Sequence, residues 1–186
     1  MYPSLRGGND NPGFKEAFLG EIDDVLAAAD FLSRQDGVDP QRIYLGGHST
    51  GGTVALLAAE TSNRFRAIFS FGPVEDIRGY GPEFQVFDSH NPAEVDSRNP
   101  GKWLDSIQSR TFVIEGSRRP GNIAAIRSMS RSTKNPHVTF LAVASANHFN
   151  ILAPATRLIA ERILQDSGPT TNINLSEGDL NLSYAR

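Results

Sequence analysis

A serine flanked by glycines is the strongest chemical signal in the sequence. Ser49 lies in residues 47–52 (Gly-His-Ser-Thr-Gly-Gly), between a β-prone run at 42–46 and an alanine- and leucine-rich segment. A Gly-x-Ser-x-Gly run at a strand-to-helix turn strains the serine backbone and exposes its hydroxyl beside the helix N-terminus. The same turn places the backbone N–H of Thr50 where it can donate to a developing oxyanion. We therefore predict that Ser49 is a nucleophile and that Thr50 contributes to an oxyanion hole.

A histidine near the other end of the chain is the candidate general base. A serine hydroxyl is a weak nucleophile until a base takes its proton. His148 follows the apolar residues 138–143, which we predict to be the last strand, and it precedes a predicted helix. In the chain order Ser, acid, His, the histidine of such a site lies after the final strand, as His148 does. Three further histidines lack this placement: His48, His90 and His137.

The sequence identifies the carboxylate that would orient His148 less clearly than the serine and the histidine. Such an acid fixes the imidazole tautomer and stabilises the imidazolium that forms during the reaction. Glu115, at the end of the third predicted strand, is our preferred candidate. Glu75 and Asp76, in the loop after the second predicted strand, are alternatives. A Ser-His pair without an acid is the remaining alternative.

Strands that alternate with helices must position these residues. The apolar patterns predict four strands, at 42–46, 67–71, 111–115 and 138–143. They also predict four helices, at 14–32, 53–60, 123–131 and 154–165. This alternation indicates βαβ units and a mostly parallel sheet, and the nearly continuous apolar character of the strands indicates burial on both faces. The fold class is therefore α/β. Residues 72–105 are predicted to be irregular. Their aromatic residues either line a substrate pocket or, as we favour, serve as packing residues (Tyr80, Phe84, Phe87 and Trp103).

On these residues, the chain resembles the catalytic domain of the prolyl oligopeptidase family of serine peptidases, in the α/β-hydrolase superfamily. The doubled glycine after the turn, the loop 2–8 (Tyr-Pro-Ser-Leu-Arg-Gly-Gly) and the histidine loop 147–149 (Asn-His-Phe) are similar to those of the family. The resemblance covers residues 2–166. It implies a hydrolase that cleaves a peptide or amide bond through an acyl-enzyme on Ser49, with His148 as base.

Two departures from the family pattern are visible. The family usually shows a His-Gly-x-x-Asp run after the third of these strands, but here the glycine is Gly116 and Arg119 stands at the aspartate position. An α/β-hydrolase sheet has about eight strands, and the four predicted here correspond to the last four. We therefore expect residues 1–166 to form a partial α/β-hydrolase domain that lacks its N-terminal strands. Residues 167–186 are expected to be a loosely held polar tail.

Composition excludes several other classes of function. The chain of 186 residues contains no cysteine, which rules out disulfides, thiolate zinc sites and cysteine nucleophiles. The net charge of −3 is spread without a basic stripe, so we expect no nucleic-acid partner. No apolar run approaches the roughly 20 residues that cross a bilayer, so we expect no membrane partner. We expect no metal or organic cofactor.

The sequence therefore favours a serine hydrolase, and among serine hydrolases a serine-type peptidase acting on a peptide or small acyl substrate. The first alternative is a carboxylesterase-type enzyme, because the same residues can cleave either bond. The second is an incomplete, non-catalytic hydrolase homologue, which the irregular acid position and the short sheet suggest. Residues 1–4 show no apolar signal-peptide region, which favours a cytoplasmic location.

Overall fold

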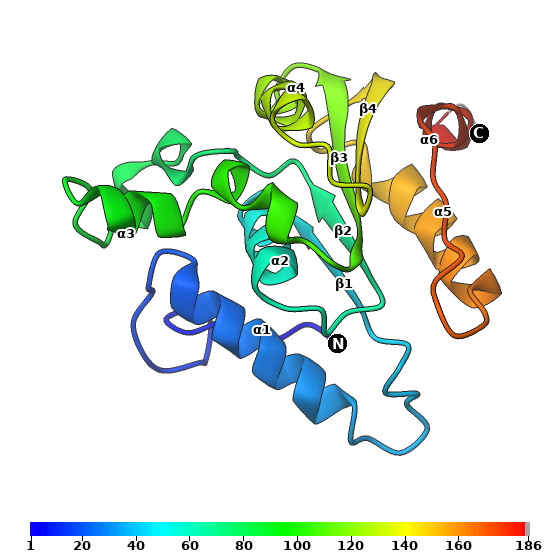
Figure 1. Ribbon diagram of the computed structural model, residues 1–186, viewed down its shortest axis with the longest axis horizontal. Helices are drawn as coiled ribbons and strands as arrows, with labels where there is room; N and C mark the ends of the chain where they lie inside the picture. The colour runs from blue at the N-terminus through cyan, green and yellow to red at the C-terminus, as the bar shows by residue number, and fades with distance from the viewer. Residues whose placement is uncertain (185–186) are drawn as a thin grey trace.

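A parallel sheet of four strands forms the centre of the structure, a computed structural model that describes residues 1–184. The strands lie in the order β1-β2-β3-β4, and each pairs in parallel with its neighbour (Figure 1). Their bounds are Tyr44–His48 (β1), Ala67–Phe71 (β2), Arg110–Arg118 (β3) and Val138–Asn147 (β4). The predicted α/β class with a parallel sheet is confirmed.

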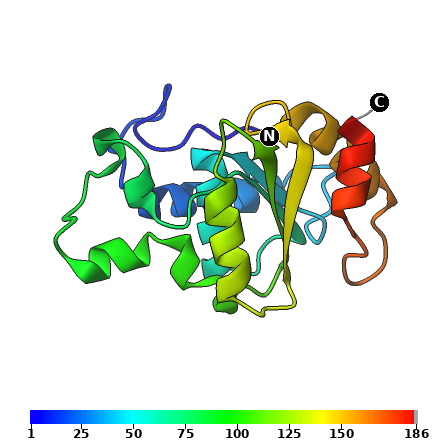
Figure 2. The same ribbon diagram turned by 90° about the horizontal axis from the view of Figure 1, so that it is seen from above.

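Helices cover both faces of this sheet. The longer helices are α1 (Leu19–Leu32), α2 (Thr50–Thr61), α4 (Ile123–Ser132), α5 (Leu152–Gln165) and α6 (Glu177–Tyr184). Seen from above, the sheet stands between α4 on one side and α5 and α6 on the other (Figure 2). Strand β2 is buried along its whole length because an apolar cluster fills each face. Within the described residues, no helix is both long and apolar enough to span a bilayer.

The strand register brings the turns that follow β1 and β4 to one edge of the sheet. His48 at the end of β1 pairs with Phe71, and Phe71 pairs with Ile114. Strands β3 and β4 continue beyond this level, through a register shift, to the pair Arg118 and Asn147. Ser49 and His148 therefore both follow the carboxyl ends of parallel strands.

Some predicted boundaries differ from the structure. Helix α1 begins at Leu19, whereas the pattern predicted a start at Phe14. Ala17 and Phe18 have φ angles of 51° and 80°, which an α-helix does not allow. Phe18 is buried in the core in this conformation, so tertiary packing overrides the local helical pattern. In the region predicted to be irregular, 72–105, the structure has four short 3₁₀ segments and the six-residue helix α3 (Pro92–Ser97).

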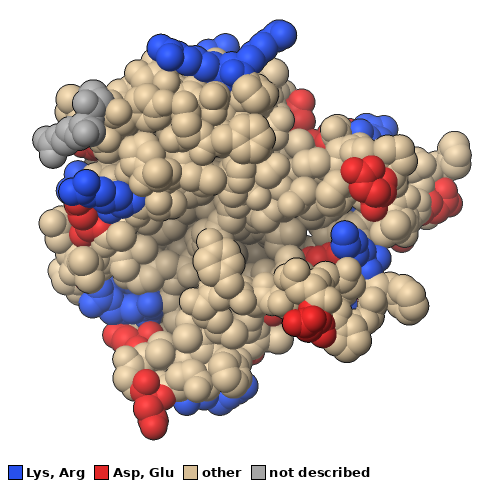
Figure 3. Space-filling view, turned by 180° about the vertical axis from the view of Figure 1, so that it is seen from behind, with Lys and Arg blue, Asp and Glu red and all other residues tan. Residues whose placement is uncertain are grey.

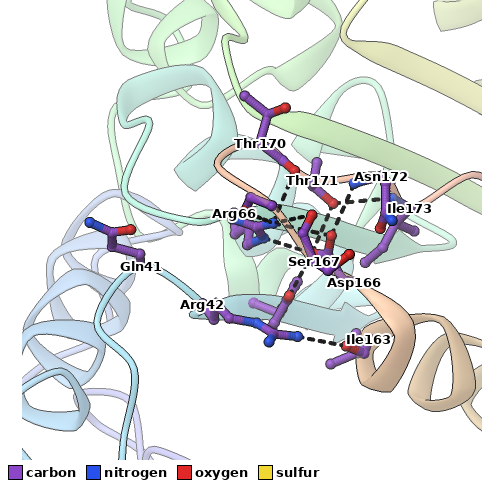
Figure 4. Close-up of polar contacts among 12 residues, drawn as sticks. Gln41, Arg42, Arg66, Ile163, Asp166, Ser167, Thr170, Thr171, Asn172 and Ile173 are labelled. Atoms are coloured by element: carbon purple, nitrogen blue, oxygen red, sulfur yellow. Dashed lines mark hydrogen bonds and ion pairs between the residues drawn. The ribbon is translucent and has the colours of Figure 1, made fainter.

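The C-terminal segment is held firmly, which contradicts the expectation of a loose tail. Asp166 is 1% exposed, and its carboxylate accepts hydrogen bonds from Arg66 Nε at 2.7 Å and from the Tyr44 hydroxyl at 2.6 Å (Figure 4). Thr171 and the backbone N–H of Asn172 donate to the same carboxylate. These bonds were invisible in the local sequence pattern because Arg66 and Asp166 are 100 positions apart.

The guanidinium of Arg66 also fixes the path of the segment that follows Asp166. Its Nη2 donates to the backbone carbonyl groups of Ser167, Gly168 and Thr170. Beyond this point the chain continues into α6, whose side chain Leu180 is buried in the apolar cluster shared with α5. Residues 167–184 are therefore part of the folded domain.

Within residues 1–184, the carboxylate of Glu60 is buried and has no hydrogen-bonding partner. It lies in the last turn of α2, and neither of its carboxylate oxygens is solvent-accessible or hydrogen-bonded. Burial raises the pKa of Glu60 well above its usual value of 4.5. The carbonyl groups at the helix C-terminus further disfavour a negative charge there. Glu60 therefore keeps its proton in the folded chain at pH values where the unfolded chain releases it.

We expect Glu60→Gln to raise the free energy of unfolding by about 1–3 kcal/mol at about pH 8. Above pH 4.5 the folded wild type holds one proton more than the unfolded chain, so its stability falls as the pH rises. The variant has no such proton, and its advantage should shrink toward zero near the acid end of this range. Urea unfolding across the range measures the difference. The control Glu161→Gln, at a side chain 55% exposed, should change stability by less than about 0.5 kcal/mol throughout. Equal effects of the two substitutions would contradict this account.

Candidate active site

Ser49 occupies a strained turn between β1 and α2. Its φ of 57° and ψ of −115° lie outside the conformations that a serine normally adopts. The neighbouring glycines make this turn sterically possible. A Cβ at Gly47 would lie 2.0 Å from the carbonyl oxygen of Gly51, and one at Gly52 would lie 2.3 Å from that of Phe71. Any larger residue would push strand and helix apart, so the turn has the geometry that a Gly-x-Ser-x-Gly run is expected to produce.

Thr50 begins α2, directly after the strained serine. The first N–H groups of a helix have no carbonyl partner within the helix, so the N–H of Thr50 can donate to a bound group. The partial positive charge at the helix N-terminus favours an anion at this place. The N–H of Thr50 is therefore free of helix hydrogen bonds, and its role as an oxyanion donor stays a prediction.

His148 and Glu115 form a buried hydrogen-bonded pair. Nδ1 of His148 lies 2.8 Å from Oε2 of Glu115, and both residues are buried. Because a carboxylate accepts, Nδ1 carries the proton and donates it to Glu115. In the neutral imidazole, this leaves Nε2 without a proton, as a general base requires.

Several protein groups donate hydrogen bonds to the carboxylate of Glu115. The backbone N–H of Gly116 donates to Oε1 at 2.7 Å, and that of Asn122 donates to Oε2 at 3.0 Å. Together with His148, three donors thus stabilise its charge in a fully buried place. Gly72, at φ 56°, leaves the room for this pair: a Cβ there would lie 2.5 Å from Cε1 of the His148 ring.

The alternative acids lie elsewhere. Asp76 accepts hydrogen bonds from the backbone and side chain of Arg78, and the Arg78 guanidinium holds the pKa of Asp76 below its usual value. In residues 1–184, neither Asp76 nor Glu75 forms a hydrogen bond with His148. Arg119, at the position of the family's aspartate, is exposed. Among the carboxylates considered, the structure brings Glu115 to the histidine.

The turn after β1 and the loop after β4 are in direct contact. Nε2 of His48 lies 2.8 Å from the backbone carbonyl oxygen of His148, and the two imidazole rings have centroids 4.4 Å apart. Since His48 immediately precedes Ser49, this contact brings the serine turn and the histidine loop together. The sequence interpretation had considered His48 only as a candidate base and set it aside, because it does not follow the final strand.

Tyr80 also reaches this site, although the sequence interpretation favoured a packing role for the aromatic residues of its region. Its hydroxyl lies 2.8 Å from Oγ1 of Thr53 on α2. Burial raises the pKa of the Tyr80 phenol, while hydrogen bonding with Thr53 and Ser49 acts in the opposite direction. A phenol therefore lies next to the serine. No local pattern marks it, because it comes from the irregular region and is positioned by stacking on Phe18, with ring centroids 5.5 Å apart.

A mainly apolar cavity opens beside the N-terminus of α2. Its volume is about 280 Å³, and its walls include Thr50, Gly51, Val54, Phe18 and Phe84. In the view from behind, the charged side chains of the described residues lie mostly toward the margin, and the hollowed centre of the face is largely uncharged (Figure 3). Within residues 1–184, no group of three or more His, Cys, Asp or Glu side chains could hold a metal ion.

Four parallel strands, a strained serine at a strand-to-helix turn and a histidine after the last strand are the architecture of the α/β hydrolases, here in partial form. The model of the prolyl oligopeptidase family matches residues 16–118, which is more than half of the chain. The chain belongs to this family. No curated protein matches it in sequence.

Solved structures of hydrolases share this fold. Dipeptidyl peptidase 4 from Porphyromonas gingivalis is 20% identical, with a TM-score of 0.65 over 80% of this chain and 22% of that protein. An acylaminoacyl peptidase is 13% identical, with a TM-score of 0.65 over 90% of this chain and 30% of that protein. The esterase Pf2001 from Pyrococcus furiosus is 19% identical, with a TM-score of 0.65 over 87% of this chain and 66% of the esterase. The chain thus spans about a fifth of the length of the dipeptidyl peptidase it resembles.

Proposed function

We propose that the chain is a serine hydrolase that forms an acyl-enzyme on Ser49, with His148 as general base and Glu115 as the acid that orients it. The hydrogen bond between Nδ1 of His148 and Oε2 of Glu115, 2.8 Å long and buried at the serine edge of the sheet, carries this proposal. It supplies the tautomer in which Nε2 can accept the serine proton. Membership of a peptidase family supports the same reaction.

The reaction would proceed in two halves. Oγ of Ser49 attacks the substrate carbonyl carbon while its proton passes to Nε2 of His148, and the N–H of Thr50 donates to the oxyanion. The protonated His148 then gives its proton to the departing amine or alcohol, which leaves the acyl group on Ser49. A water molecule then attacks this ester while it gives a proton to His148. His148 returns that proton to Oγ of Ser49 as the bond between Oγ and the acyl carbon breaks, and the carboxylic acid is released. Buried Glu115 stabilises the imidazolium during both halves.

The favoured substrate is a peptide or amide, because the family and several structural neighbours are peptidases. An ester substrate is the second candidate, supported by the esterase whose fold covers 87% of this chain. The cavity beside Thr50 is mainly apolar and could receive part of either substrate, although charged residues also contribute to its lining (Arg6, Lys15, Glu21 and Glu83).

A fluorophosphonate probe tests the proposed nucleophile. We expect the probe to label the chain of residues 1–186 on Ser49 and to leave Ser49→Ala unlabelled, because the probe reacts with an activated serine hydroxyl. Ser4→Ala, in the N-terminal loop, is the matched control and should label like the wild type. Labelling that survives Ser49→Ala, or a folded wild type that resists the probe, would contradict the proposal. Hydrolysis of proline-containing peptide amides compared with short-chain acyl esters then separates the two substrate classes.

A further inference from the structure

The side chain of His48 bridges two segments that no strand pairing joins. His48 ends β1, which lies at one border of the sheet, and His148 follows β4, which lies at the other. Nε2 of His48 lies 2.8 Å from the carbonyl oxygen of His148. Because a carbonyl oxygen can only accept, Nε2 of His48 carries a proton and donates it. The bond therefore connects the residue before the proposed nucleophile to the backbone of the proposed base.

The same contact completes the fixation of His148. The backbone N–H of His148 donates to the carbonyl of Pro120 at 3.0 Å, and its ring donates from Nδ1 to Glu115 at 2.8 Å. The His48 donor holds the carbonyl, so the backbone donor, the backbone acceptor and one ring nitrogen of His148 are all engaged. The Phe149 ring packs edge-on against both imidazoles, with centroids 5.1 Å from His148 and 6.0 Å from His48. These contacts tie the loop that carries His148 to β1, to Glu115 and to Pro120.

From this arrangement we infer that His48 is a positioning residue, which sets the separation between the Ser49 hydroxyl and the His148 imidazole by donating a hydrogen bond to the His148 carbonyl. The inference rests on the proposed serine hydrolase. Proton transfer between two heavy atoms needs them within hydrogen-bonding reach, and a shift of about 1 Å at a reacting group can cost about 10²-fold in rate. Without the hydrogen bond from His48 to the His148 carbonyl, the loop that carries His148 could shift by this distance.

Two substitutions distinguish the effect of the hydrogen-bond donor at position 48 from the effect of the bulk of the imidazole ring. His48→Phe keeps a flat ring beside His148 and Phe149 but removes the donor. His48→Gln places an amide nitrogen at about the position of Nε2 and restores the donor without an imidazole.

With p-nitrophenyl acetate as substrate, we expect His48→Phe to lower kcat by about 10–100-fold with little change in KM. His48→Gln should recover kcat to within about threefold of the wild type. His137→Phe, an exposed histidine at the amino end of β4, is the control and should leave both constants unchanged.

Other results would overturn the inference. It is wrong if His48→Phe turns over like the wild type, or if His48→Gln loses as much activity as His48→Phe. Should His48→Phe not fold, His48→Asn takes its place, because the shorter amide cannot reach the carbonyl and should show the same loss of kcat. A wild type that neither hydrolyses the ester nor takes up the fluorophosphonate refutes the proposed function, and this inference falls with it. An active, Ser49-dependent wild type that is insensitive to the donor at position 48 refutes the inference alone.

Discussion

Glu115→Gln is expected to lower kcat for p-nitrophenyl acetate by about 10⁴-fold, as the loss of the orienting carboxylate does in serine hydrolases. The glutamine has nearly the same shape, but its amide group cannot accept every hydrogen bond that the carboxylate accepts from His148, Gly116 and Asn122. If its amide nitrogen faces Nδ1, the imidazole must carry its proton on Nε2, and that nitrogen can no longer take the proton of Ser49. The imidazolium also loses its counter-charge.

Two matched substitutions decide whether this effect belongs to Glu115. Glu75→Gln and Asp76→Asn remove the alternative acids, neither of which hydrogen-bonds to His148 in the described residues, and both should keep kcat within a few fold of the wild type. Circular dichroism and the thermal midpoint show whether Glu115→Gln is folded. A folded Glu115→Gln with wild-type turnover, or a larger loss in Asp76→Asn, would assign the acid elsewhere.

Asp166→Asn is expected to reduce the free energy of unfolding by about 3–5 kcal/mol, the range found when one partner of a buried ion pair is removed. The substitution leaves the Arg66 guanidinium, only 7% exposed, without its counter-charge. It also weakens the hydrogen bonds from Tyr44, Thr171 and Asn172 that anchor the C-terminal segment. Urea unfolding at neutral pH measures the loss.

An exposed ion pair provides the control. Asp30 lies 3.1 Å from Nε of Arg64, but its side chain is 58% exposed, so Asp30→Asn should cost less than about 1 kcal/mol. If Asp166→Asn and Asp30→Asn reduce the free energy of unfolding by the same amount, burial does not determine the strength of the ion pair between Asp166 and Arg66.

The contribution of Asp166 should also depend on pH. Burial raises the pKa of its carboxyl, but hydrogen bonds from Arg66, Tyr44, Asn172 and Thr171 outweigh that effect and hold the pKa well below its ordinary value. The unfolded chain therefore binds the proton first as the pH falls. The stabilisation is complete above the ordinary aspartate value of 3.8 and is lost progressively below it. The gap in stability between wild type and Asp166→Asn should accordingly narrow in acid.

The sequence predicted the sheet and the serine turn well because both depend on local patterns. Apolar runs set the strands, and Gly47 is required within the turn itself, because an added Cβ would lie 2.0 Å from the carbonyl oxygen of Gly51. Glu115 was harder to choose over Glu75 and Asp76. The distance to His148 depends on how β3 and β4 pair beyond Gly116, where the register shifts. No single segment carries that information.

Residues positioned by contacts distant in the sequence escaped prediction. The tail was expected to be loose because its anchor, Arg66, lies in the turn before β2 and has no visible relation to Asp166 in the sequence. Tyr80 reaches Thr53 through stacking that involves Phe18, which itself has a left-handed backbone conformation. His48 and His148 meet although β1 and β4 lie at opposite borders of the sheet, because the segment after β4 reaches back to the end of β1.

The two borders of the sheet differ in their capacity to accept another strand. At the β4 border, α6 packs alongside, and the carboxylate of Glu177 accepts the backbone N–H of Ala142 at 2.9 Å. At the β1 border, Tyr44–His48 pairs with β2 alone within residues 1–184, so its outward backbone groups remain available to a further strand. A further strand, whether from the same polypeptide or from a second molecule, would therefore pair with β1, at the border that carries the serine turn.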